Sequence, residues 1–66
     1  MTQEELEEEI YEFLKKQQGM VLLGEVINEL HKKLDEMEGL SIDAALSSLR
    51  DQGKIILNEK VSAKAI

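Results

Sequence analysis

Apolar side chains recur at helical spacing in three successive segments of this chain, and a glycine follows each segment, at Gly19, Gly39 and Gly53. Residues three and four positions apart share one face of an α-helix, so each segment predicts an amphipathic helix. Glycine adopts the left-handed backbone that ends many helices, and it therefore marks the three stops. Because the chain has no proline, we expect a single domain over residues 1–66 with one shared core.

The first segment has a start signal as well as an apolar stripe. Thr2 precedes Glu5 by three positions, which is the capping-box pattern of a helix N-terminus. The apolar side chains of the stripe are Leu6, Ile10, Phe13 and Leu14. The run "MVLL" after Gly19 is too short for a helix and predicts a brief extended piece.

The second segment predicts a helix that begins near Leu23 or Gly24 and ends near Glu38. Its expected inward face has the spacing i, i+4, i+7 and i+11. The residues of this face are Leu23, Ile27, Leu30 and Leu34, with Val26 and Met37 at its margins.

The third segment, "SIDAALSSLRDQG", has a capping residue at both ends, Ser41 and Gly53. Serine is a favourable N-cap because its hydroxyl accepts a bond from a free amide of the first turn. The expected inward residues are Ile42, Ala45, Leu46 and Leu49. The runs "KIIL" and "KVSA", separated by Asn58 and Glu59, then predict a short β-hairpin. The predicted fold class is therefore α+β, with three helices and a hairpin.

Size and composition exclude several classes of protein. A chain of 66 residues with one Phe, one Tyr and no cysteine forms a small aliphatic core and has neither disulfides nor thiolate metal sites. Its apolar runs are far shorter than the roughly 20 residues of a membrane-spanning helix, so we expect a cytoplasmic protein. The lone histidine, His31, lacks metal-ligand spacing. We predict no cofactor, no small-molecule substrate and no enzymatic activity.

Charge is unevenly distributed along the chain. The net charge is −6, and 11 of the 14 acidic residues precede residue 41. The run "EELEEE" is interpreted as a solvated helix face whose carboxylates favour the helix N-terminus. From residue 41 onward, four cations, Arg50, Lys54, Lys60 and Lys64, outnumber three acids. We therefore expect the acidic surface to face away from the third helix and the hairpin.

The order helix, short extended piece, helix, tight turn, helix, hairpin resembles that of the winged helix-turn-helix superfamily. The stretch "IDAALSSLRDQGKIIL" carries the resemblance most specifically, with Gly53 ending the helix and Ile55 and Ile56 opening the wing. Within the superfamily, "GLSIDAALSSLRDQGKII" is loosely similar to the C-terminal winged-helix domains of archaeal minichromosome-maintenance helicases. Common transcription regulators fit about as well, and the fold alone does not identify a partner.

The resemblance implies two competing functions. In DNA-binding relatives the third helix enters the major groove, so the first hypothesis is weak DNA contact by a transcription regulator or a replication-factor appendage. The residues assigned to this contact are Ser47, Ser48, Arg50, Lys54 and Lys60. The alternative is a protein-interaction module, because small side chains on the outer face of the third helix admit a partner's close approach. We expect a monomer, because pairing through the Glu-rich first helix would bring like charges together.

Overall fold

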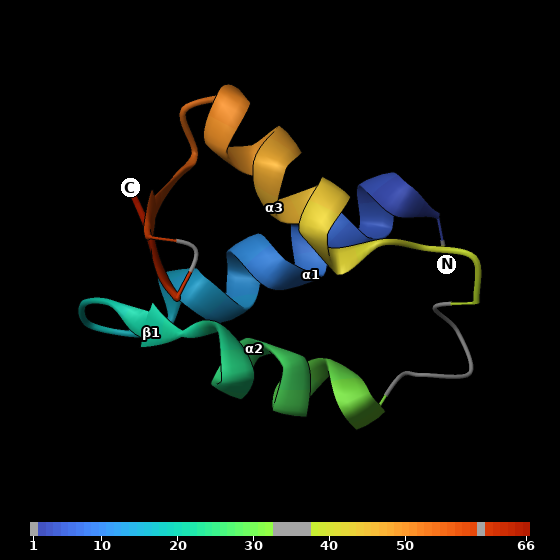
Figure 1. Ribbon diagram of the computed structural model, residues 1–66, viewed down its shortest axis with the longest axis horizontal. Coiled ribbons are helices and arrows are strands. Elements are labelled where there is room, and N and C mark those ends of the chain that lie inside the picture. The colour runs from blue at the N-terminus through green and yellow to red at the C-terminus, as the bar shows by residue number, and fades with distance from the viewer. Residues whose placement is uncertain (1, 33–37, 60) are drawn as a thin grey trace.

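The computed structural model describes residues 2–32, 38–59 and 61–66. Within these residues the chain forms three helices and a small antiparallel sheet, which confirms the α+β prediction. The elements are α1 (Gln3–Lys15), β1 (Val21–Leu22), α2 (Leu23–Leu30), α3 (Ile42–Asp51), β2 (Ile55–Asn58) and β3 (Ser62–Ala65). In Figure 1, α1 lies in the middle, with α3 along one side of it and α2 along the other.

The predicted capping box at the start of α1 is confirmed. The Glu5 backbone N–H donates to Thr2 Oγ1 over 3.1 Å, and the Thr2 backbone N–H donates to Glu5 Oε1 over 3.0 Å. Donation by the Thr2 backbone, and secondarily by its side chain, lowers the pKa of Glu5 below its ordinary value. The helix therefore starts where two local groups satisfy amides that have no partner inside the helix.

The start and end of α3 also follow their sequence signals. Ser41 Oγ accepts from the Ala44 backbone N–H over 3.1 Å. At the other end Gly53 has a φ of 74°, and two bonds close the helix: Gly53 N–H to the Arg50 carbonyl and Lys54 N–H to the Leu49 carbonyl. This pair of bonds is the Schellman arrangement, which satisfies the last free carbonyls of a helix.

The sheet has the strand order β1-β3-β2. The short extended piece and the hairpin were predicted separately, and the structure joins them by pairing Val21 with Ala63 and Leu22 with Ser62. The hairpin closes through a bond from the Val61 N–H to the Asn58 carbonyl, at 3.0 Å. The last strand is Ser62–Ala65 rather than the predicted 60–63, because the loop includes Val61 as well as Glu59; Lys60 lies outside the described residues.

The core lies between the three helices and the inner face of the sheet. Its buried residues are Leu6, Ile10, Leu14, Val21, Val26, Leu30, Ala45, Leu46, Leu49, Ile55 and Ala63. Phe13, Leu23 and Ile42 pack against this cluster and are partly buried. The apolar stripes predicted for α1 and α3 therefore face the core.

The inward face predicted for α2 was partly wrong. Val26 is buried whereas Ile27 is 48% exposed, although the spacing had assigned Ile27 to the core and Val26 to its margin. The reason is the position of α1, because Val26 and Leu30 line the same contact region as Ile10 and Phe13 of α1. The helix α2 ends at Leu30, with His31 as its C-cap, rather than near Glu38. Leu34 and Met37, which the prediction also assigned to this helix, lie outside the described residues.

Candidate interaction surface

The outward face of α3 was the predicted contact surface, and most of its expected members lie there. The exposed residues of this helix are Asp43, Ala44, Ser47, Arg50 and Asp51. Arg50 has Asp51 as its ionic neighbour, with 3.4 Å between the guanidinium nitrogen and the carboxylate oxygen. An exposed ion pair of this kind contributes little stability, but it offsets the charge that Arg50 would offer a phosphate.

Ser48 does not lie on the outward face, contrary to the prediction. It is half-buried against α1, where its hydroxyl donates to Glu7 Oε1 over 3.0 Å. The Gln52 side-chain amide donates both to Ser48 Oγ, at 2.9 Å, and to Glu7 Oε1, at 3.0 Å. Because these three side chains satisfy one another, Ser48 belongs to the α1–α3 contact and is turned away from an external partner.

The predicted basic residues that the structure describes, Arg50, Lys54 and Lys64, have different surroundings. Lys54 turns toward α1, with its Nζ 5.6 Å from the centre of the Tyr11 ring, and Lys15 Nζ lies 5.3 Å from the same centre. Both distances fall within the range of a cation–π attraction. Lys64 is exposed on β3, and Lys60 lies outside the described residues. Among the predicted DNA contacts, therefore, Arg50 and Lys54 are described cations, and they face different neighbours.

The acidic surface does not turn away from α3, which corrects the expectation drawn from the charge distribution. Glu4, Glu7 and Glu8 of α1 line a hollow that also includes Gln52 and Lys54. The charge segments are separate in the sequence, but α1 packs directly along α3 (Figure 1). The negative potential of α1 therefore extends to the end of α3, which disfavours the approach of a polyanion.

A shallow pocket of about 230 Å³ opens between α3 and the hairpin. Leu23, Leu46 and Leu57 form its apolar walls, and Asp43, Ser47 and Arg50 line its remaining surface. Drug-sized ligands occupy cavities of about 300–1,000 Å³, so this pocket is small for such a molecule. Its apolar walls and its two charges of opposite sign suit a single amphipathic side chain.

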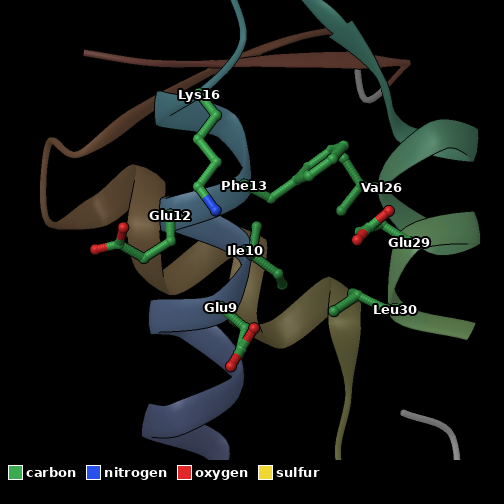
Figure 2. Close-up of a pocket in the computed structure, with 8 residues that line it drawn as sticks. All are labelled: Glu9, Ile10, Glu12, Phe13, Lys16, Val26, Glu29 and Leu30. Carbon is green, nitrogen blue, oxygen red and sulfur yellow. The ribbon is translucent and has the colours of Figure 1, made fainter. Parts of the chain in front are cut away.

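A second pocket lies between α1 and α2 and is shown in Figure 2. Its volume is about 120 Å³, and the Phe13 ring extends from α1 across the gap toward Val26 of α2 (Figure 2). The Lys16 amine and the Glu29 carboxylate lie on its two flanks. Phe13 packs against the core and is partly buried, so this small pocket lies at the edge of the core.

Other candidate chemistry has little support in the described residues. His31 is exposed at the end of α2. No three His, Cys, Asp or Glu side chains in 2–32, 38–59 and 61–66 converge as a metal site. Over the same ranges, none of the helices has both the length and the apolar character needed to cross a bilayer.

Comparison with known proteins leaves the chain without an assigned family: no protein-family model, curated protein or solved structure matches it.

The pocket between α3 and the hairpin includes leucines that the sequence did not assign to a site. Leu46 and Leu23 had been placed on the inward faces of their helices, and Leu57 had been assigned only to the hairpin. No sequence signal indicates that one pocket collects these leucines, because Leu23 and Leu57 are 34 positions apart.

Proposed function

We propose that this chain is a non-catalytic winged-helix domain that binds another protein through the pocket between α3 and the hairpin. The observed order α1, β1, α2, α3, β2, β3 supports the winged-helix interpretation, since it matches the order that motivated the resemblance. The pocket is the observation on which the proposed function rests. Three leucines, one cation and one anion surround a space of side-chain size.

The arrangement of the polar groups favours a protein over DNA. DNA binding depends on several cations that neutralise successive phosphates. Here Arg50 is next to Asp51, Lys54 lies over Tyr11, and Ser48 is bonded to Glu7. A protein partner instead gains from apolar walls that exclude water around a few polar contacts. The predicted partner segment has one aliphatic or aromatic side chain for the pocket, flanked by groups that complement Asp43 and Arg50.

The test is selection of binding peptides from a displayed random library, with the full chain as bait. We expect enriched peptides to share an apolar anchor and to lose binding when Ser47→Arg fills the rim of the pocket. Gln17→Arg is the matched control, because Gln17 is exposed beyond the end of α1 and the variant has the same charge change. Peptides that bind wild type and Ser47→Arg equally would show that the pocket is not the binding site.

DNA contact is the second candidate, and the exposed cations Arg50 and Lys54 near the end of α3 favour it. Two phosphate contacts would give a slope of about −2 in log K against log salt. Labelled duplex is titrated at low and at moderate salt with wild type and Lys54→Glu. Absence of binding at low salt would eliminate this candidate for the isolated chain, whereas binding that Lys54→Glu removes would displace the protein-binding proposal.

A further inference from the structure

The outer face of the sheet carries exposed apolar side chains beside the polar Asn58 and Ser62, and no described helix covers it. Along each strand successive side chains point to opposite faces. Val21, Ile55 and Ala63 are buried on the inner face. Their neighbours Leu22 and Ile56 lie on the outer face and are 57% and 51% exposed. This face is distinct from the pocket beside α3, because Leu57, which lines that pocket, points inward.

Continuing the strand pairing by one residue at each end enlarges the outer face. Ile66 donates its backbone N–H to the Lys54 carbonyl at 2.9 Å, so the β2–β3 ladder extends to Ile66, which shares the face of Lys64. The Val21–Ala63 register places Met20 opposite Lys64. Met20 and Ile66 are both exposed, like Leu22 and Ile56. We name the outer patch as the set Met20, Leu22, Ile56, Lys64 and Ile66.

Lys64 occupies the centre of this outer patch. It pairs directly with Ile56 on β2, the register places Met20 on its other side, and Ile66 follows it by two positions on the same face. Among the residues of the described strands, Lys64 is the one charged side chain. Ser62 lies two positions before Lys64 on the same face, so apolar groups flank this cation on three sides. Such a cation is a specific recognition feature, because its apolar neighbours limit the access of water to the ionic contact that a partner makes there.

The sequences of the two edge strands, β1 and β2, favour a covered face. A strand with one wet face alternates apolar and polar residues, whereas a strand buried on both faces is a continuous apolar run. β1 lies within "MVLL" and β2 begins with "IIL", so both have the second pattern. The central strand β3, "SAKA", alternates and places Ser62 and Lys64 on the outer face. The four apolar residues of the outer patch expose on the order of 400 Å², the size of the largest, often functional, patches on monomers.

We propose that the outer patch binds an amphipathic helix of another protein whose apolar stripe has one carboxylate facing Lys64. A helix is the element that covers an open sheet face, and charge complementarity specifies the acidic residue. A second copy of this chain fits less well, because a symmetric face-to-face contact opposes Lys64 with itself and brings together two molecules of net charge −6. The area suits a weak, transient complex rather than an obligate one.

The experiment selects from a display library of 20-residue helical peptides randomised along one face. The baits are the full wild-type chain, Lys64→Glu, the double variant Leu22→Ser/Ile56→Ser, and Lys32→Glu. Lys32→Glu is the matched charge control, because Lys32 is exposed beyond α2 and pairs with Glu29 over 3.6 Å. Circular dichroism and NMR spectra of each bait establish that it is folded before selection.

We expect wild type and Lys32→Glu to enrich apolar stripes with a central Asp or Glu, and Lys64→Glu to enrich Lys or Arg at the same position. An enriched peptide should bind Lys64→Glu at least tenfold more weakly by fluorescence anisotropy, and exchanging its acid for Lys should restore binding. The double serine variant should bind neither peptide. The proposal is overturned if nothing is enriched, if enrichment ignores Lys64→Glu, or if wild type sediments as a dimer that the double variant dissociates. The Ser47→Arg variant distinguishes the two surfaces, since it should leave this binding intact.

Discussion

The Glu7–Ser48–Gln52 contact gives the sharpest test of the interpretation that Ser48 holds α3 against α1. Replacing Ser48 with Ala removes a bond to a carboxylate and a bond from the Gln52 amide. A hydrogen bond to a charged group contributes about 1.5–3 kcal/mol when it is well shielded. Since this site is only half-buried, we expect a loss of about 1 kcal/mol.

The single variant understates this loss. Alanine is a better helix former than serine by up to roughly 0.5 kcal/mol, and this gain offsets part of the lost bonding. Glu7→Ala has the same complication, because it also removes one negative charge from a crowded acidic helix. A double-mutant cycle cancels both effects, so the coupling free energy between Glu7 and Ser48 isolates the contact.

The measurement is urea unfolding followed by circular dichroism at fixed pH and salt for wild type, Glu7→Ala, Ser48→Ala and the double variant. A coupling of about 1 kcal/mol corresponds to a change of about 1 M in the midpoint, because m is about 1 kcal/mol/M for a small domain. The control cycle pairs Glu7→Ala with Ser47→Ala, whose side chain is exposed on α3, and its coupling should be close to zero. A Glu7–Ser48 coupling below about 0.3 kcal/mol would refute the structural role and return Ser48 to the candidate contact residues.

Four further substitutions test other parts of the fold. Ile10→Ala removes a fully buried side chain and should lower the free energy of unfolding by about 2–5 kcal/mol, a large fraction of the roughly 3–10 kcal/mol expected for a chain of this length. The thermal midpoint should therefore fall by about 10 °C or more, and a midpoint within about 3 °C of wild type would contradict the packing. Gly53→Ala should destabilise the fold by about 1 kcal/mol, because φ is 74° at this position. Gly24→Ala should stabilise the fold by up to about 1 kcal/mol, because Gly24 is in α2 and has open space around the added Cβ. Chemical denaturation that gives both changes in unfolding free energy the same sign would invalidate the cap assignment. The difference in free energy of unfolding between Glu5→Gln and wild type should shrink as pH falls below about 4.5. The pKa of the folded Glu5 carboxyl is lowered, so the stability that this carboxylate contributes is present above its ordinary pKa and is lost as pH falls through the folded value. A difference that does not change with pH would rule this out.

The sequence by itself determined the local structure. The capping residues Thr2 and Ser41 and the glycine stop at Gly53 act on backbone groups within five positions of themselves, so their effect is present in the sequence neighbourhood. The apolar stripes of α1 and α3 were equally clear, because each offers one contiguous apolar face. The presence of α1, α3 and the hairpin follows from these short-range signals.

Tertiary structure decided which side chains face one another. Val26 rather than Ile27 enters the core because α1 lies on that side of α2, and both residues fit the helical spacing. Ser48 meets Glu7 across 41 positions, and Lys54 meets Tyr11 across the same α1–α3 boundary. Periodicity identifies a face only relative to its own helix axis; the rotation of each helix and its neighbours depend on packing between segments far apart in the chain. The candidate surfaces, which combine α3 with the hairpin or β1 with β3, exist only after that packing is complete.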